Sequence, residues 1–144
     1  MQRRDFLAGG AAAVLLVAGR ATGEGTGVSL DSSSAAAHAL TPASRLLFIS
    51  GQVPTDADGN APARFSQQCR LAWRNLEAQL AAADMQLRHL VKVTVFLARP
   101  DDRRREREIR RERLSGVAQP SISVVMAGIY DETWRIEIEA IALA

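Results

Sequence analysis

The sequence has little cysteine and few potential metal ligands, and each scarcity excludes a class of protein. Cys69 is the only cysteine among 144 residues, so the chain cannot form an intramolecular disulfide. No histidine lies near Cys69 in the sequence, so we expect a small helix residue packed on the core rather than a reactive nucleophile. Neither metal-ligand spacing nor an internal repeat is present. What remains is one domain's length of chain, enough to bury a core without disulfides or metals.

Long apolar runs are missing too. The run near the N-terminus is too short for a bilayer, which needs about 20 apolar residues. It follows Arg3 and Arg4 and ends in small residues, so residues 1–21 are predicted to be a twin-arginine export signal with a processing site after Ala21. An uncleaved anchor or a fortuitous arginine pair would look the same. The signal predicts a periplasmic protein with no other membrane contact.

Net charge disappears once this signal is removed. The chain has 18 Lys and Arg and 16 Asp and Glu, of which residues 1–21 hold three and one, leaving 15 of each sign. The remaining domain is therefore neutral and gives no support for nucleic-acid binding. Segment 101–114 is rich in arginine, but interleaved acidic residues favour a solvated helix held by ion pairs at i,i+4 spacing over a nucleic-acid-binding helix.

Hydrophobic periodicity predicts an α+β fold. Residues 22–36 have a linker composition and lead into a domain at 37–144. Apolar residues at helical spacing predict a helix in 65–85, and the charged segment 101–114 a second one. Apolar and alternating segments predict a mixed sheet with both helices on one face. The predicted strands are a weak one at 28–30 and others at 46–50, 90–98, 121–129 and 134–144.

Four of these segments together resemble the RidA family, also called YjgF, of enamine and imine deaminases. They are SGQVPTDADGN, QQCRLAWRNLEAQLAAA, LVKVTVFLARPDD and IEIEAIALA, in the family's order and spacing. The resemblance covers residues 37–144 and implies a chorismate-mutase-like fold and a homotrimer with small-molecule pockets between subunits. It further implies hydrolysis, without a cofactor or metal, of reactive C=N compounds such as 2-aminoacrylate to a keto acid and ammonia.

The resemblance also implies which residues line the pocket. Glu137, the first glutamate of IEIEA, corresponds to the family's acid/base group, and Ser50 and Gly51 of SGQ correspond to the pocket wall. Such hydrolysis needs a group that relays protons with water and a cation for a substrate carboxylate. The family takes this cation from the arginine of a P-A-R-S motif. Here residues 120–123 read PSIS, so Ile122 stands in the arginine's place.

Further departures surround this substitution. The family's pocket tyrosine corresponds to about Ala36, and His38 nearby could either reach the pocket or be structural. Segment 117–129 contains no ionisable residue. Arg135 precedes Glu137 by two residues, so strand alternation would place both on one face, about 6.5–7 Å apart. Arg135 could replace the missing arginine or form an ion pair at the sheet rim.

Two functions remain open at this point. The first is a RidA-like hydrolase that acts on an imine or enamine whose recognition does not depend on a carboxylate. The second is a non-catalytic small-molecule-binding trimer, with a pocket lined by Ile122, Val124 and Ser50. Retention of Glu137 and SGQ favours the enzyme, whereas loss of the arginine and tyrosine favours the binding protein. A chaperone-like role of the trimer surface has little support beyond the charged second helix.

Overall fold

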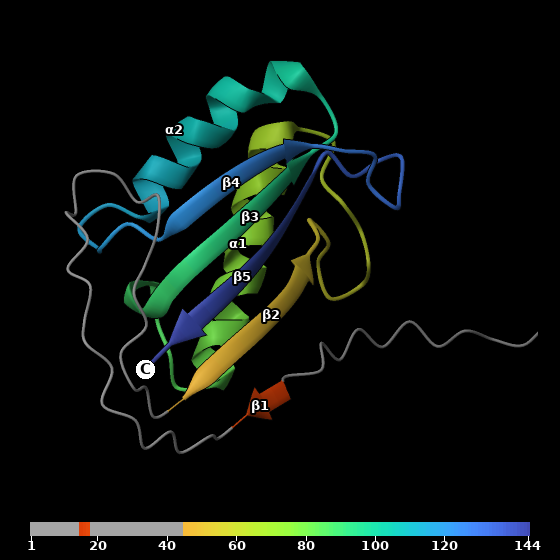
Figure 1. Ribbon diagram of the computed structural model, residues 1–144. Coiled ribbons are helices and arrows are strands. Elements are labelled where there is room, and N and C mark those ends of the chain that lie inside the picture. Colours follow the sequence, from red (N-terminus) through yellow and green to blue (C-terminus); the bar gives the residue numbers. More distant parts are fainter. Residues whose placement is uncertain (1–14, 18–44) are drawn as a thin grey trace, which may run out of the picture.

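A mixed sheet in the order β1-β2-β5-β3-β4 organises residues 15–17 and 45–144, the part of the chain that the computed structural model describes (Figure 1). Strands β3 and β4 are parallel, and all other neighbouring strands are antiparallel. Two helices complete an α+β fold, as the sequence predicts. The strands are β1 (Leu15–Val17), β2 (Leu46–Gln52), β3 (Leu90–Leu97), β4 (Ser121–Met126) and β5 (Ile136–Leu143).

The predicted strands at 46–50, 90–98, 121–129 and 134–144 correspond to β2, β3, β4 and β5. The strand predicted at 28–30 lies outside the described residues. Strand β1 instead comes from the segment predicted to be the export signal, and its backbone pairs with the edge of β2. The export signal itself stays a prediction.

Helix α1 (Phe65–Ala82) covers one face of the sheet because its apolar side chains recur at helical spacing (Figure 1). Its C-terminus follows from local backbone geometry. The N–H of Ala83 binds carbonyls of the last turn, and Asp84 then takes a left-handed φ of 54° that breaks the helix. A short 3₁₀ turn, Leu87–His89, leads directly into β3.

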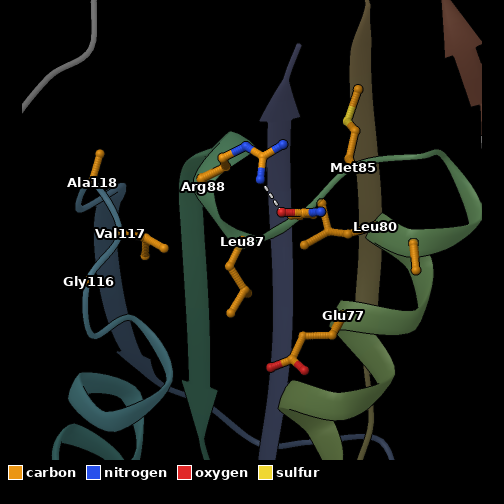
Figure 2. A pocket seen from close by; sticks show the side chains of 10 residues that line it. Glu77, Leu80, Met85, Leu87, Arg88, Gly116, Val117 and Ala118 are labelled. Atoms are coloured by element: carbon orange, nitrogen blue, oxygen red, sulfur yellow. Dashed lines mark hydrogen bonds between the residues drawn. The ribbon is translucent and has the colours of Figure 1, made fainter.

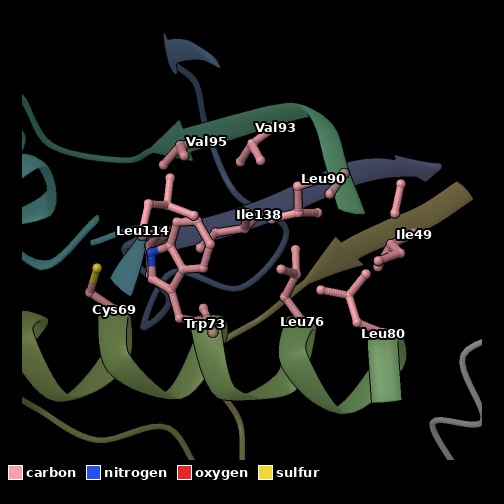
Figure 3. Packing of buried hydrophobic residues seen from close by; sticks show 14 of the residues in the cluster. Ile49, Cys69, Trp73, Leu76, Leu80, Leu90, Val93, Val95, Leu114 and Ile138 are labelled. Carbon is pink, nitrogen blue, oxygen red and sulfur yellow. The ribbon is translucent and has the colours of Figure 1, made fainter. Parts of the chain in front are cut away.

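The hydrophobic core lies between α1 and the sheet (Figure 3). Trp73 is fully buried at its centre, and residues of β3 and β5 approach it from the sheet. Burying one side chain of this size stabilises the fold by roughly 1.5–3 kcal/mol, so this layer fixes the helix on the sheet. The figure labels Cys69, Trp73, Leu76 and Leu80 of α1, Ile49 of β2, Leu90, Val93 and Val95 of β3, Leu114, and Ile138 of β5.

Helix α2 (Arg103–Arg113) connects the parallel strands β3 and β4 and packs beside α1. It follows a 3₁₀ turn at Pro100–Asp102. The predicted i,i+4 spacing is present in the pair of Arg110 with Glu106 at 2.7 Å, whereas Arg105 binds Glu108 at 2.9 Å with i,i+3 spacing. Most of the helix is solvated as predicted, but Glu106 is buried together with Ile109 where α2 faces the core. The buried carboxylate is paired because an unpaired one would be costly there.

The other face of the sheet, which is turned to the viewer in Figure 1, carries no helix among the described residues. Strand alternation assigns side chains to this open face: buried and more accessible positions alternate along β2, β3 and β5. Phe48 of β2 is 46% exposed there, and Glu137 and Glu139 of β5 point the same way. The open face is therefore where the predicted acid/base residue lies.

Candidate functional site

Glu137 lies directly over the backbone of Gly51. A Cβ atom on Gly51 would be 1.7 Å from Oε1 of Glu137 and 2.6 Å from its Cδ, closer than real side chains pack. The approach occurs where the register between β2 and β5 shifts, between Ile49 and Gln52. Such an irregularity leaves backbone next to a side chain of the partner strand. Two residues predicted to share a pocket thus lie side by side.

The carboxylate of Glu137 has no hydrogen-bond or ion-pair partner among the described residues, although it is partly buried. An unpaired carboxylate beside an open backbone can accept a proton from a bound molecule and return it. The neighbouring backbone adds polar groups. The carbonyl of Ser50 accepts a hydrogen bond from Nε2 of Gln52 at 2.9 Å, within the stretch of β2 where the register shifts.

Ser50 lies beside Gly51 at the edge of a hollow of about 490 Å³ on the open face. The hollow crosses β2, β5 and β3, and Glu139 and Thr94 also line it. Sequence reasoning singled out Ser50 but did not find this hollow. The alternating pattern of β3 could have indicated the hollow, because it places polar side chains of β3 on the same face as the glutamates of β5.

Ile122 and Val124 lie on the opposite side of the sheet from Glu137 within one chain. In the parallel ladder, Ile122 pairs with Val93 and Val124 pairs with Val95, and both partners are fully buried against α1. Ile122 packs against the core. A pocket that brings either residue to Glu137 would therefore need a second copy of the chain.

Arg135 does not lie beside Glu137, and the expectation based on alternation fails here. Arg135 precedes β5, and its guanidinium binds the carboxylate of Asp102 through two hydrogen bonds, Nε to Oδ2 at 2.9 Å and Nη2 to Oδ1 at 2.5 Å. It also lies 5.3 Å from the ring centroid of Phe65. Arg135 is thus held at the rim on the α1 side. This is the ion-pair alternative, with a partner from the turn before α2 rather than from a neighbouring strand.

A second buried polar residue, Gln68 of α1, holds the same region and was missed by sequence reasoning. Its amide nitrogen donates to the carbonyls of Pro62 and Thr133, both at 2.8 Å, and its oxygen accepts from the Arg135 backbone N–H at 2.8 Å. A glutamine inside an amphipathic helix gives no sequence signal for this role. Gln68 fixes the backbone two residues before Glu137.

The other sequence candidates contribute less. Burial, helped by the charge of Glu106, raises the pKa of Cys69 to about 12, so the thiol stays protonated and inert as expected. Ala36 and His38 lie outside the described residues. Within residues 15–17 and 45–144, no histidine, cysteine or carboxylate cluster could hold a metal ion. In the same part of the chain, no helix combines the length and hydrophobicity that crossing a membrane requires.

The larger cavity, of about 630 Å³, lies on the helix side (Figure 2). Glu77 and Leu80 of α1, Leu87 of the 3₁₀ turn, and Val117 line it, and Arg88 stands at its edge. Glu77 is engaged by Arg113 at 3.4 Å. None of the residues predicted for the site lines this cavity. We therefore do not assign the functional site to it, although it is larger than the hollow on the open face.

The fold matches the one that comparison with known proteins gives. A family model described as "Endoribonuclease L-PSP" matches residues 28–144. The chain belongs to the RidA (YjgF) family. "Putative reactive intermediate deaminase TdcF" of Escherichia coli K12 is 30% identical over 101 residues, which cover 68% of this chain and 78% of TdcF. "Protein DfrA" of Myxococcus xanthus is 31% identical over 108 residues, 71% of this chain and 79% of DfrA.

A third member matches over a shorter stretch. "RutC family protein YjgH" of E. coli K12 is 46% identical over 57 residues, which are 40% of this chain and 44% of YjgH. Among solved structures, E. coli TdcF with bound serine superposes with a TM-score of 0.66 at 28% identity, covering 76% of this chain and 94% of that one. The E. coli YjgF gene product gives a TM-score of 0.65 at 29% identity, with coverages of 68% and 80%. This RidA member therefore shares the family fold.

Proposed function

We propose that this RidA protein is a hydrolase that converts a reactive imine or enamine to a carbonyl compound and ammonia, with Glu137 as the acid/base group. The observation that supports the proposal most is the unpaired Glu137 carboxylate held against Gly51. The name of its relative TdcF, a reactive intermediate deaminase, points to the same reaction class.

The proposed chemistry needs one water molecule and one proton relay. An enamine first takes a proton at carbon to become an iminium ion. Glu137 then removes a proton from water as its oxygen bonds to the iminium carbon, and the C=N π electrons move to nitrogen. Glu137 returns the proton to that nitrogen and then takes the hydroxyl proton as the C–N bond breaks, so that ammonia leaves and the neutral carbonyl forms. That proton is the one that protonates the carbon of the next enamine. The backbone at Ser50 and Gly51 would hold the reacting group by hydrogen bonds.

The substrate we propose lacks a carboxylate near its reacting carbon. No cation lies beside Glu137 in the described part of the chain, because Ile122 packs against the core and Arg135 is bound to Asp102. An arginine–carboxylate pair contributes roughly 1.5–3 kcal/mol, which is about 10- to 100-fold in affinity. Substrates that depend on that pair should therefore be poor ones.

Two matched imines test the proposal. An amine oxidase makes 2-iminopropane from isopropylamine, and an amino-acid oxidase makes 2-iminopropanoate from alanine, so the two differ by a carboxylate in place of a methyl group. We expect the protein to raise ammonia release from 2-iminopropane above the spontaneous rate, and by more than from 2-iminopropanoate. Glu137→Gln should remove at least about 100-fold of that acceleration, whereas the exposed Glu132→Gln should keep it. An unchanged Glu137→Gln rate would refute the role of Glu137.

The alternative is a binding protein that holds a small molecule without turning it over. The lack of a cation beside Glu137 favours it, since hydrolysis of amino-acid-derived substrates needs that charge. Saturable binding of a small neutral carbonyl compound, with no acceleration of either imine, would select this function. Measurable turnover would exclude it.

The proposed setting is a homotrimer in the periplasm, delivered by the twin-arginine route. Arg3 and Arg4 ahead of a modest apolar run support the route. Changing both to lysine should leave the precursor in the cytoplasm. A wild-type protein that fractionates with the cytoplasm and keeps Met1 would contradict this localisation.

A further inference from the structure

The two helices carry an excess of positive charge that the neutral net charge of the domain conceals. Helices α1 and α2 together contain nine arginines and four glutamates, whereas the rest of residues 45–144 contains six Lys and Arg and nine Asp and Glu. Positive charge is therefore concentrated on the helix side of the sheet, away from the open face (Figure 1). Net charge alone could not show this separation, because it does not depend on which segments lie side by side.

All four glutamates of the two helices are already bound by arginines, at 2.7–3.4 Å. The pairs are Arg70–Glu112, Arg105–Glu108, Arg110–Glu106 and Arg113–Glu77. Each glutamate offsets one arginine, which leaves five of the nine arginines over, four of them in α2. The excess charge of the helix side therefore lies mainly on α2.

The four remaining arginines of α2 share one face of the helix. At about 100° per residue they fall within an arc of about 100°, roughly opposite the buried Ile109. All four are exposed. We call them the arginine ridge, which consists of Arg103, Arg104, Arg107 and Arg111.

Most of the hydrogen-bonding capacity of the arginine ridge is unused. Arg107 and Arg111 make no hydrogen bond or ion pair within the described part of the chain. Arg103 donates only from Nε, to the Pro100 carbonyl at 3.3 Å, and the Arg104 side chain is 92% exposed. Like charges four residues apart destabilise a helix, so the stability of α2 does not explain the ridge. The ridge is instead suited to an anionic partner outside the chain.

The composition of α2 favours a surface that carries phosphates. A guanidinium binds phosphate through two parallel hydrogen bonds. Helix α2 consists of Arg, Glu and one Ile, so it has no aromatic residue to stack on a base and no amide to read a base edge. Its only apolar residue, Ile109, is fully buried, so α2 cannot insert into hydrocarbon. Lipids move laterally, and their headgroup phosphates can therefore gather at the ridge.

We propose that the arginine ridge binds the protein to bilayers that contain anionic phospholipids, through headgroup phosphates and without insertion. The sequence predicted no membrane contact beyond the export signal, and the ridge changes that expectation. Each arginine near an anionic bilayer raises partitioning about 5-fold. Because the ridge lies on the helix side, membrane binding is independent of the reaction proposed at Glu137.

Co-sedimentation of the full-length assembled protein with lipid vesicles tests the proposal. One set of vesicles is phosphatidylcholine alone, and the other contains about one third phosphatidylglycerol. We expect partitioning at least about 10-fold stronger onto the anionic vesicles at low salt, and loss of this preference at about 1 M salt, where charges are screened. Residues 1–21 are present in every variant, so ratios between variants report the ridge alone.

The double variant Arg107→Gln/Arg111→Gln should lower partitioning onto anionic vesicles by at least about 10-fold. The variant Arg107→Lys/Arg111→Lys keeps both charges and should retain most of the binding. The matched control is Arg64→Gln/Arg88→Gln, which removes two exposed arginines outside α2 and should change partitioning by less than about 3-fold.

Three results would overturn the proposal. The first is equal binding to both kinds of vesicle, and the second is an equal loss in the ridge variant and its control. The third is a nucleic-acid duplex that binds more tightly than anionic vesicles and is released by Arg107→Gln/Arg111→Gln, since the ridge would then serve nucleic acid. Imine hydrolysis and the sedimenting mass of that variant should equal those of the wild type. A change in either would assign the ridge to folding or assembly instead.

Discussion

At Gly51 one methyl group would decide the position of Glu137. The carboxylate occupies the space that any side chain at residue 51 would fill. The resemblance of the SGQ and IEIEA motifs to the RidA family predicted that Gly51 and Glu137 share a site, and the structure places them in contact. What the sequence could not supply is the shift in strand register that makes the contact possible, because register is set by tertiary pairing.

Gly51→Ala should therefore move the Glu137 side chain without unfolding the protein. The new methyl group would displace a flexible carboxylate, so we expect a loss of at least 10-fold in imine hydrolysis and a smaller loss of stability. Gly128→Ala is the matched control, since a Cβ there meets nothing within 4 Å. Activity and thermal denaturation of both variants give the comparison. Full activity of Gly51→Ala would mean that the close approach has no functional role.

The titration of His89 should make the free energy of unfolding depend on pH. The backbone N–H of Gln86 donates to Nδ1 of His89, which requires an unprotonated nitrogen. Burial, followed by the charges of Arg88 and Arg45, lowers the pKa of His89 below 6.5. A lowered pKa in the folded state means that the contribution is complete above pH 6.5 and is lost as pH falls toward the folded pKa.

The melting temperature of the wild type should consequently fall between pH 7.5 and 5.5 by more than that of His89→Asn. Asparagine keeps an acceptor oxygen that does not titrate in this range, so the local hydrogen bond can persist. Thermal scans of both proteins in the same buffers measure the difference. Parallel pH curves for the two proteins would assign the dependence to other groups.

At the scale of elements, the strands and helices of residues 46–143 follow their sequence patterns closely, whereas their junctions do not. The start of β5 is the main example. Alternation placed Arg135 with Glu137, but the chain turns at residues 131–134, where Trp134 N–H binds the Asp131 carbonyl. Arg135 then reaches Asp102 instead. Contacts between a loop and a distant 3₁₀ turn have no local sequence signature, so only the fold reveals them.

Asp102→Ala should destabilise the protein strongly, because it leaves Arg135 partly buried without its partner. Asp102 is 5% exposed, and removing one member of a buried pair costs about 3–5 kcal/mol. Stacking on Phe65 remains, so the lower end of that range is expected. Asp101→Ala, an exposed neighbour, should change the free energy of unfolding by less than about 0.5 kcal/mol. Urea denaturation of both variants checks this, and equal losses would contradict the role given to the pair.

At the scale of the whole molecule, the open face carries large apolar side chains that are partly exposed in the single chain. Phe48 is 46% exposed, and Val125 is 39% exposed on the edge strand β4. Contiguous exposed apolar side chains and an unpaired sheet edge usually mark an interface. The family resemblance predicted a trimer from the sequence. The sequence does not show which surfaces of the chain contact a neighbouring copy. The trimer and its subunit-interface pocket therefore stay predictions.

Sedimentation of the mature protein should give the mass of three chains at micromolar concentration. Phe48→Arg should shift it toward one chain, because it places a charge where copies pack, while circular dichroism keeps its helical signal. Arg107→Ala on the exposed side of α2 is the control and should stay trimeric. A stable wild-type monomer would contradict both the trimer and the pocket predicted between its subunits.

The role of Glu137 and the lack of a carboxylate-binding cation beside it are tested most directly by a crystal structure. Crystals of the protein would be soaked with a keto-acid product, 2-oxobutyrate, or with a ketone product, acetone. The product carbonyl should lie within hydrogen-bonding distance of the Glu137 carboxylate and next to the Gly51 backbone. Acetone should bind at least as completely as 2-oxobutyrate, because no cation of the described residues lies beside Glu137. Products found in the helix-side cavity, or 2-oxobutyrate held at the Glu137 site by an arginine, would contradict it.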